Sequence, residues 1–165
     1  MIEIRRAAPG DGEALGEIHA AAWEAAYAPF FEPSFAARAV RSRRTRWHER
    51  ITDGPTTILL ALLDGRPGAL SFFGPSETRP QLAEIHSFYA HPDSWGSGIA
   101  SALMAEVLRC MGEDGFARTH LWTLRNTPRS RRFYTKCGFA ECGTTRAFDF
   151  GDGKPLEQVE YERAL

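Results

Sequence analysis

The sequence predicts an α/β domain of the α+β type, with one mixed, mostly antiparallel sheet of about seven strands flanked by four helices. Several β-prone runs follow one another across short turns, which favours antiparallel pairs. Two segments with a helical pattern of apolar residues lie between β-prone runs. Helices in such positions are crossover connections between strands that no hairpin joins. The 165 residues suit one folding unit and show no linker or internal repeat, so we expect a single domain over 1–165.

The amino-terminal part predicts one strand followed by two helices. Residues 2–7 read as a strand, and Asp11 then precedes a helix with Leu15 and Ile18 on its apolar side. Pro29 ends that helix. A second helix is expected over 33–51, with an apolar side at Phe35, Ala39, Val40, Trp47 and Ile51 and with arginines elsewhere at Arg38, Arg41, Arg43, Arg44, Arg46 and Arg50.

A hairpin is expected next. Residues 56–63 are strongly β-prone, Asp64 and Gly65 form a favoured two-residue turn, and 67–73 return antiparallel to the first strand. The following residues, 74–80, are rich in turn formers and are expected to form an exposed loop.

The next stretch joins a strand to a helix through a glycine turn. Residues 82–90 suit a mostly buried strand that stops at Pro92. Gly96 and Gly98 then turn the chain without a Cβ penalty, and 99–111 carries a strong helical period. Because unpaired N–H groups and the positive end of the helix dipole meet at a helix amino terminus, this turn favours an anion such as phosphate.

The carboxyl-terminal part predicts a strand, a short helix and a final strand pair. Residues 119–124 read as a strand, and Thr127 before Pro128 is a helix start in which the hydroxyl can cap the helix. The helix is expected to reach Lys136. Residues 139–150 and 156–163 then read as an antiparallel pair around the turn 151–154.

Composition narrows the class of protein. The formal net charge of -1 gives no overall attraction to nucleic acid or to an anionic membrane. No apolar run approaches the length of a membrane span and no signal-peptide pattern opens the chain, so we expect a cytoplasmic protein. Cys110, Cys137 and Cys142 are odd in number and show no metal-site spacing, so neither a disulfide framework nor a bound metal is expected.

Two motifs carry a family resemblance. Residues 84–101 combine a strand, Ala-His-Pro, a short loop and Trp-Gly-Ser-Gly-Ile-Ala at a helix start, and they resemble motif A of the GNAT superfamily of N-acetyltransferases. Residues 133–139, Phe-Tyr-Thr-Lys-Cys-Gly-Phe, resemble motif B of that family. The order of the expected elements is also that of the GNAT (acyl-CoA N-acyltransferase) fold, and the resemblance spans nearly the whole chain.

The resemblance implies acetyl-CoA as co-substrate. It places the pyrophosphate on the glycine loop and first helical turn, and the pantetheine arm along the preceding strand. Core packing is the alternative role for Phe133. The residues implied for acetyl-CoA are Phe88, Tyr89, Ala90, Trp95, Gly96, Ser97, Gly98, Ile99, Ala100, Ser101, Asn126, Thr127, Phe133 and Lys136.

Three positions depart from the family pattern. Trp95 stands where Gln or Arg is frequent, and Ser97 stands where a cation is frequent. Thr127 replaces a frequent asparagine, which is displaced to Asn126. We therefore expect the loop to bind phosphate mainly through its backbone amides, with one phosphate-pairing cation missing.

The resemblance also implies catalytic residues. Tyr134 matches a tyrosine that can protonate the departing CoA thiolate, and Glu84 lies where some members carry a glutamate base. His86 follows on the same strand, on the same face if the strand is regular, and imidazoles titrate closer to neutral pH than carboxylates do. The alternatives are a solvent-facing strand residue for Glu84 and a structural histidine for His86.

The acceptor side is less well defined by the sequence. The resemblance implies that Trp23 and Tyr27, near the end of the first long helix, line the acceptor pocket, and core packing is the alternative for Trp23. The arginines within 38–50 could attract an acidic substrate or nucleic acid. A charge run on an amphipathic helix is nevertheless usually a solvated face.

The sequence thus predicts an N-acetyltransferase that moves an acetyl group from acetyl-CoA to a primary amine of a small molecule or peptide by direct attack in a ternary complex. No cysteine matches an acyl carrier. Two other classes stay open: a noncatalytic acyl-CoA-binding or sensor domain, and a nucleic-acid-binding protein that uses the arginine-rich helix, although no nucleic-acid-binding motif supports the latter. The sequence leaves open which amine is the acceptor and whether the protein is a homodimer.

Overall fold

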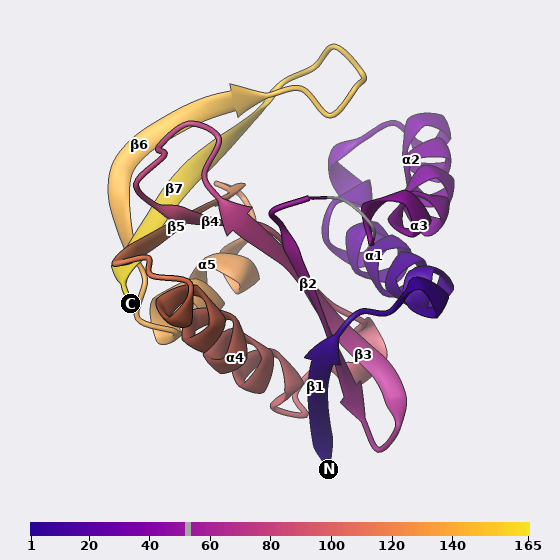
Figure 1. The fold of residues 1–165 in the computed structure, drawn as a ribbon. Helices are drawn as coiled ribbons and strands as arrows, with labels where there is room; N and C mark the ends of the chain where they lie inside the picture. Colours follow the sequence, from indigo (N-terminus) through magenta and orange to yellow (C-terminus); the bar gives the residue numbers. More distant parts are fainter. Residues whose placement is uncertain (52–53) are drawn as a thin grey trace.

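A computed structural model describes residues 1–51 and 54–165 and contains one seven-stranded sheet (Figure 1). The strand order is β1-β2-β3-β4-β5-β7-β6, in which β4 and β5 are parallel and the other neighbours are antiparallel. This confirms the expected mixed, mostly antiparallel sheet. The strands are β1 (Ile2–Arg6), β2 (Thr57–Leu63), β3 (Arg66–Pro75), β4 (Ala83–Ala90), β5 (Arg118–Leu124), β6 (Ala140–Phe148) and β7 (Leu156–Ala164).

The helices follow the predicted order with one correction. The expected helix over 33–51 is wrong as one element, because it is interrupted at Arg46 and divides into α2 and α3. The interruption allows Trp47 to turn into the core, where its indole is fully buried. The helices are α1 (Gly12–Ala26), α2 (Pro33–Thr45), α3 (Trp47–Arg50), α4 (Ile99–Glu113) and α5 (Pro128–Lys136), with the short 3-10 helices η1 (Pro9–Asp11), η2 (Ala28–Phe30) and η3 (Pro92–Ser94).

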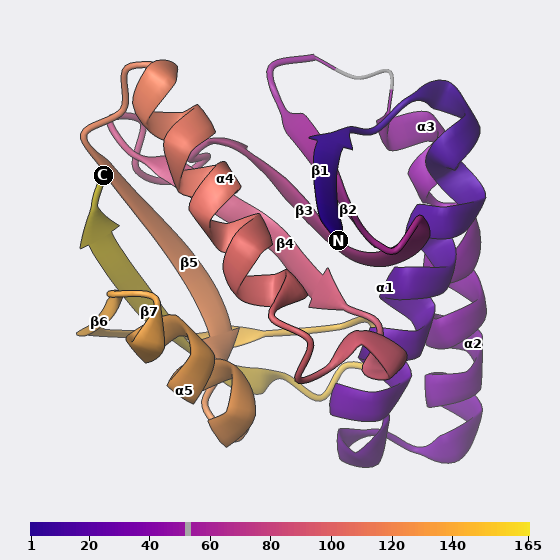
Figure 2. The same ribbon diagram turned by 90° about the horizontal axis from the view of Figure 1, so that it is seen from below.

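Helices cover both faces of the sheet (Figures 1 and 2). On one face α4 and α5 pack over a core that runs from β2 to β7 and includes Leu103, Val107 and Val159. On the other face α1 and α3 pack on β2 and β3 through Leu15 and Trp47, while α2 packs on α1. The sheet therefore separates two apolar cores, each formed by the periodic apolar side of its helices.

The hairpin between β2 and β3 forms as the turn residues predict. Asp64 and Gly65 both have positive φ, at 50° and 78°, which suits the primed turn that matches strand twist. β3 is longer than expected and continues to Pro75.

The pair β4 and β5 parts soon after it begins. Its parallel pairing covers Ala83 to Ile85, and both strands then continue as neighbours that separate toward their carboxyl ends (Figure 2). A bulge at His86 accompanies the separation, because Phe72 and Phe73 of β3 pair with Ser87 and Ile85 and leave His86 between them. Bulges of this kind bend a strand and re-aim its side chains.

The bulge changes which residues of β4 face each side. Before it, Ile85 points into the core beneath α4; after it, Phe88 and Ala90 point to that same side. Tyr89 joins the opposite core beneath α1. A regular strand would have kept Ile85 and Tyr89 on one face. The bulge puts them on opposite faces, while Glu84 and His86 remain neighbours.

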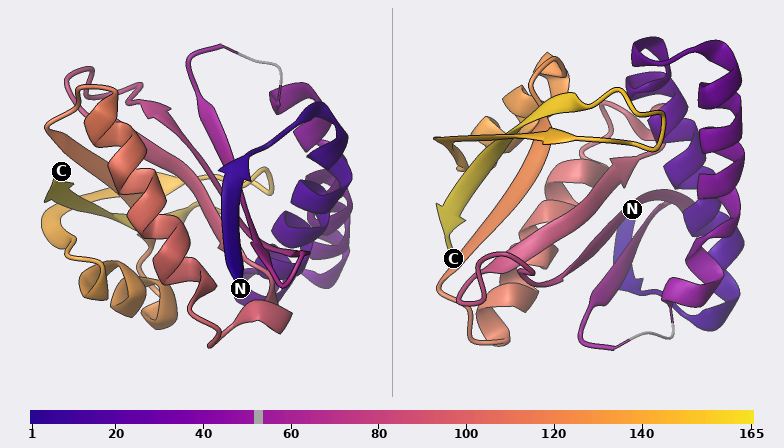
Figure 3. Two further views of the ribbon diagram at one scale, coloured as in Figure 1. Left: turned by 60° about the horizontal axis from the view of Figure 1, so that its bottom comes forward. Right: turned by 90° about the horizontal axis from the view of Figure 1, so that it is seen from above.

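The loop between β6 and β7 reaches back to the helices (Figure 3). Phe150 in this loop lies against Tyr27 and Phe31, at ring-centroid distances of 6.2 and 5.5 Å. This aromatic cluster joins the last hairpin to the segment after α1, although the two are more than a hundred residues apart in sequence.

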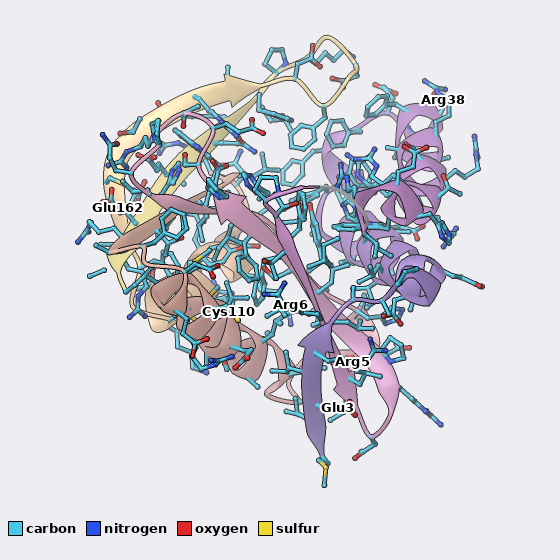
Figure 4. The ribbon with its side chains drawn as sticks, viewed as in Figure 1. Glu3, Arg5, Arg6, Arg38, Cys110 and Glu162 are labelled. Atoms are coloured by element: carbon cyan, nitrogen blue, oxygen red, sulfur yellow. The ribbon has the colours of Figure 1, made fainter. Side chains whose placement is uncertain are left out.

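The arginines of α2 do not share one environment. Arg38 lies on the outside of the helix and is exposed, as expected for a solvated face (Figure 4). Arg43 is only 9% exposed and packs over the ring of Trp23 at 4.3 Å. The expectation that Arg43 lies on a polar side of the helix is therefore wrong, since α2 uses this side chain to cover α1.

Close contact between α1 and α2 gives a first prediction. A Cβ added at Gly16 would lie 2.0 Å from the carbonyl oxygen of Arg44, a backbone atom that cannot move without shifting α2. We expect Gly16→Ala to lower the free energy of unfolding by about 1–3 kcal/mol despite the better helix propensity of alanine. Denaturant titration followed by circular dichroism measures the change.

Gly112 supplies the control for Gly16. It also lies in a helix, α4, but an added Cβ there meets no atom within 4 Å. Gly112→Ala is therefore expected to raise the free energy of unfolding by about 0.5–1 kcal/mol. Equal stability of the two variants would show that the two helices do not pack as described.

Candidate active site

A groove of about 690 Å³ opens where β4 and β5 part. Its walls come from the end of α1, the end of β4, the loop before α4 and the beginning of α5. The lining residues are Ala22, Ala25, Ala26, Tyr27, Phe88, Tyr89, Ala90, Ser94, Trp95, Gly96, Gly98, Ala100, Ser101, Asn126, Thr127, Pro128, Arg129, Ser130, Phe133, Tyr134 and Lys136. The sequence thus identified most of a continuous surface drawn from four separate elements.

The loop before α4 presents backbone amides to the groove. Gly96 and Gly98 have φ of 79° and 86°, a conformation that favours glycine, and a Cβ at either position would meet no protein atom within 4 Å. The first intrahelical hydrogen bond of α4 runs from the Ala102 N–H to the Gly98 carbonyl at 3.1 Å. Earlier amides, including those of Ala100 and Ser101, have no acceptor within the helix and can bind an anion.

Ser97 and Ile99 have structural places in this loop. The Ser97 hydroxyl donates to the Ser94 carbonyl at 2.5 Å and accepts from the Ile99 N–H at 3.3 Å. Ile99, the first residue of α4, is buried in the core at 1% exposure. Neither residue is among those that line the groove, so their contribution to a ligand is to shape the loop.

Trp95 and Arg129 form a contact that the sequence did not predict. The Trp95 indole N–H donates to the Ala90 carbonyl at 3.0 Å, and the Arg129 guanidinium lies 3.6 Å from the centre of the indole ring. Trp95 precedes α4 whereas Arg129 belongs to α5, so the pair joins two walls of the groove. No local motif marks Arg129, because its place depends on how α5 packs beside the α4 loop.

The groove carries positive charge. Arg129 and Lys136 are the charged side chains among the described residues that line it, and no carboxylate lies with them. Within 1–51 and 54–165 no ion pair involves Arg129 either. Arg129 therefore brings a positive charge to the groove, although position 97, where the resemblance implies a phosphate-pairing cation, is a serine.

Tyr134 lies at the inner end of the groove, 9% exposed and next to Phe133, Phe139 and Tyr161. Burial, together with the neighbouring Tyr89, raises the pKa of Tyr134 well above that of a free phenol. Its hydroxyl consequently stays protonated at neutral pH and can act as a donor. Phe133 both lines the groove and packs against Phe88 at 5.4 Å, so the expected core-packing role and a place in the groove coincide.

Thr127 does not cap α5 as expected. Its hydroxyl donates to the Leu124 carbonyl at 2.8 Å, and no side-chain cap is formed at this helix start. The hydroxyl is used instead to close the turn after β5. Asn126 is exposed and lines the groove beside it.

Glu84 and His86 lie outside the groove, on the face of β4 opposite Phe88. Glu84 Oε2 is 3.4 Å from His86 Nδ1, so the two candidates for the base are neighbours. Glu84 also lies 3.4 Å from Nε2 of the fully buried His120 and accepts a hydrogen bond from Ser76 at 3.2 Å. The expectation of a solvent-facing carboxylate does not fit Glu84, whose side chain is 13% exposed.

The histidine beside Glu84 is held between two carboxylates. His120 Nδ1 lies 2.8 Å from Glu160, and its Nε2 lies 2.7 Å from the Ser76 hydroxyl. Burial lowers the pKa of His120, but the hydrogen bonds that its ring donates to Glu84 and Glu160 outweigh burial and raise that pKa above its ordinary value. Burial likewise opposes ionisation of Glu84, while hydrogen bonds from His120 and His86 lower its pKa more strongly. Glu84 is thus an ion-paired carboxylate.

Trp23 lies behind the groove wall. Its indole is 1% exposed and stacks on Phe31 at 5.3 Å, and it is not among the lining residues. The core-packing role weighed for Trp23 therefore fits the structure, and the ring does not line the groove. Tyr27, one turn later, does line the groove and lies 5.9 Å from the Trp23 ring.

Three further observations concern the cysteines, the metal-ligating residues and the helices of the described part of the chain. No cysteine lines the groove among the described residues, and burial raises the pKa of Cys110, Cys137 and Cys142. No group of three or more His, Cys, Asp or Glu residues in the described part of the chain could hold a metal ion. Within those residues, no helix is long and apolar enough to cross a bilayer.

Comparison with known proteins decides the family. The model of the acetyltransferase (GNAT) family matches residues 16–139, which hold the glycine loop and Tyr134. The chain belongs to the GNAT family. An uncharacterized N-acetyltransferase of Mycobacterium tuberculosis is 32% identical to this GNAT chain over 143 residues, which cover 86% of this chain and 90% of the relative. A second N-acetyltransferase of that organism is 25% identical over 163 residues, covering 96% and 88%.

Solved structures share the fold of this GNAT protein. The PaiA N-acetyltransferase of Thermoplasma acidophilum, solved with coenzyme A, superposes with a TM-score of 0.80 at 21% identity over 100% of this chain and 99% of that one. The ribosomal-protein-S18-alanine N-acetyltransferase of Escherichia coli gives 0.71 at 15% identity over 99% and 94%. A Bacillus anthracis acetyltransferase solved with acetyl coenzyme A gives 0.60 at 18% identity over 70% and 65%.

The buried histidine gives a prediction about pH. A raised pKa in the folded state means that His120 contributes stability below its unfolded pKa of about 6.5, and this stability is lost as the pH rises through the folded pKa. The lowered pKa of Glu84 acts at the other end, because its contribution is lost as the pH falls below about 4.5. We expect His120→Gln to lower the free energy of unfolding by roughly 2–4 kcal/mol at pH 6 and by less at pH 9.

Denaturant titrations of both proteins from pH 5 to pH 9 measure this difference. His48→Gln is the control, since His48 is an exposed histidine of α3, remote in the fold from the buried pair of Glu84 and Glu160 around His120. A stability difference that stays constant over this range would contradict a charged His120 between Glu84 and Glu160.

Proposed function

We propose that this GNAT protein is an acetyl-CoA-dependent N-acetyltransferase that moves an acetyl group to a primary amine of a small molecule or peptide by direct attack in a ternary complex. The observation that carries the proposal is the groove, where the free amides before α4, the cations Arg129 and Lys136, and the phenol of Tyr134 share one surface. Family membership and fold neighbours solved with coenzyme A or acetyl coenzyme A support the same donor.

The groove suits a long molecule that is anionic at one end. Its outer part has the glycine loop and Arg129, which fit phosphate groups through backbone N–H and guanidinium donors. Beyond Ile85, β4 has parted from β5, so the backbone of Phe88 to Ala90 is open to pair with an extended pantetheine arm as an added strand would. The thioester then reaches the inner part near Tyr134.

The acceptor amine must lose a proton before it attacks. An amine with a pKa near 10.4 is neutral only rarely at pH 7, and its deprotonation costs about 4–5 kcal/mol. Because Glu84 is ion-paired and its pKa is lowered, its carboxylate is a weak base and serves best to anchor His86. We assign His86 as the proton acceptor, acting through water, and Glu84 as the group that orients it.

Attack then expels the CoA thiolate. The nitrogen lone pair forms a bond to the acetyl carbonyl carbon, the carbon–sulfur bond breaks, and the Tyr134 hydroxyl gives its proton to the leaving sulfur. The nitrogen then loses its second proton to solvent as the amide forms, and the Tyr134 phenolate takes a proton back from solvent. The raised pKa of Tyr134 suits an acid that must stay protonated until that step. The absence of a cysteine among the described groove residues is consistent with transfer that needs no acyl-enzyme.

Calorimetry with acetyl-CoA, followed by a thiol-release screen of amines and mass spectrometry of the product, tests the proposed function. We expect acetyl-CoA to bind, free thiol to appear with at least one amine, and the product to gain one acetyl group. Lack of binding would contradict the donor. Binding without thiol release across the panel would favour a noncatalytic acyl-CoA-binding domain.

Substitution at Gly98 tests the phosphate site. Gly98→Asp places a negative charge where the groove is proposed to hold phosphate, so acetyl-CoA affinity should fall by at least about tenfold. Gly98→Asn is the matched control, because asparagine tolerates positive φ, has the same shape and is uncharged. Calorimetry should show a much smaller loss for Gly98→Asn, and equal affinities of the two variants would contradict this placement of the phosphates.

Removal of the Tyr134 hydroxyl tests the acid. Tyr134→Phe should lower kcat by about 10²-fold while changing acetyl-CoA affinity little, because the hydroxyl acts on the departing thiolate. Tyr161→Phe is a control from the same aromatic cluster, since its hydroxyl accepts from Arg131 at 3.1 Å. Unchanged kcat in Tyr134→Phe would remove this residue from the mechanism.

A further inference from the structure

Arg43 is a buried cation without a carboxylate partner, and we infer that it binds an anionic group, a carboxylate or a phosphate, carried by the amine acceptor. This inference rests on the proposed function and names the class of its acceptor: an amine that bears an anionic group away from the reacting nitrogen. The site lies between α1 and α2, on the face of the sheet opposite α4.

The guanidinium of Arg43 is poorly satisfied. It is 9% exposed, its Nη1 donates to the Ala39 carbonyl at 3.1 Å, and its Nε has no hydrogen-bond partner. No ion pair to Arg43 occurs among the described residues. The indole N–H of Trp23, whose ring lies 4.3 Å beneath the guanidinium, is also buried without a partner. Burying a charge and several donors in this way is unfavourable unless something else pairs with them.

The surroundings of Arg43 add positive charge. Arg46 and Arg50 lie close enough to repel it, and burial together with this repulsion lowers the pKa of Arg43 to about 10, despite opposing contributions from Tyr89 and Tyr27. Arg46 reaches only the Ser42 hydroxyl among the contacts described, and Arg50 stacks over Trp47 at 5.0 Å.

His19, which lies nearby, does not offset the positive charge around Arg43. Burial and then the charge of Arg43 lower the pKa of His19 to about 2, so the imidazole is neutral at physiological pH. Its ring stacks on Tyr89 at 4.3 Å, and its Nδ1 accepts from the Trp47 indole N–H at 3.0 Å. The surroundings of Arg43 are therefore electropositive and suit a ligand that brings its own negative charge.

Aromatic contacts link Arg43 to the groove. The Trp23 ring beneath Arg43 lies 5.9 Å from the ring of Tyr27, and Tyr27 lines the groove together with Tyr134. On the same face of the sheet, Phe72 lies 5.6 Å from the Arg50 guanidinium and 5.5 Å from the His86 ring. An acceptor anchored at Arg43 can thus direct its amine toward the groove. His86 then lies on the same side of the sheet as the acceptor.

A purely structural role is the competing explanation, and stability separates the two. If Arg43 mainly braces α2 against Trp23, Arg43→Met should lower the thermal midpoint of the ligand-free protein. If it is kept for an anion, replacement by an apolar side chain of similar length should leave the midpoint unchanged or raise it by about 2–4 °C. Arg41→Met, on the exposed side of the same helix, should shift it little.

Matched amines test the ligand class directly. Thiol release is measured with 4-aminobutyrate against butylamine and with phosphoethanolamine against ethanolamine. At least one anionic member should be preferred over its neutral partner by about tenfold or more in kcat/KM, as expected for a buried ion pair. The carboxylate and phosphate arms show which anion fits.

Variants decide whether Arg43 causes that preference. Arg43→Met should reduce the ratio of anionic to neutral amine to near one, Arg43→Lys should keep part of it, and Arg41→Met should keep all of it. A lower thermal midpoint in Arg43→Met, a preference for neutral amines in the wild type, or an unchanged ratio in Arg43→Met would each overturn the inference. Failure of acetyl-CoA to bind would instead overturn the proposed function, while the thermal midpoint would still decide the role of Arg43.

Discussion

The parting of β4 from β5 after Ile85 is the constraint on which the rest of the structure depends. Backbone N–H and C=O groups that part in this way need other partners, since unpaired buried groups are costly. At the open end of β4 the Ala90 carbonyl accepts from the Trp95 indole N–H, and the groove beside this end is walled by the end of α1, the loop before α4 and α5. A sheet in which the two strands stayed paired would have no such opening.

The bulge at His86 gives the two faces of β4 different chemistry. One extra residue in the strand sends Phe88 and Ala90 to the groove side and leaves Glu84 and His86 on the other side. On the groove side the charged groups are cations, which suit phosphates. On the other side ion-paired carboxylates surround His120, and Arg43 and Arg50, which have no ion pair among the described residues, lie on α2 and α3. The proposed donor and acceptor can therefore approach one strand from opposite faces.

Sequence reasoning succeeded where the determinants were local. Asp64 and Gly65 fix a hairpin through their own backbone preferences, and Gly96 and Gly98 open α4 for the same reason. It failed where a distant partner decided the outcome. The helix over 33–51 is interrupted because Trp47 packs against α1 and the sheet, and Thr127 bonds to Leu124 instead of capping its helix.

The sequence by itself determined the family, through its resemblance to two GNAT motifs. It also determined the glycine loop and the succession of strands and helices along the chain, because these follow from short-range patterns of turn formers and apolar residues. Only the tertiary structure decided that Arg129 lies on Trp95 and that Arg43 is buried over Trp23. Each of these contacts joins residues from different elements, so its energy depends on how those elements pack. A helical pattern shows that a side chain lies off the apolar stripe, but it does not show which neighbouring element will cover that side chain.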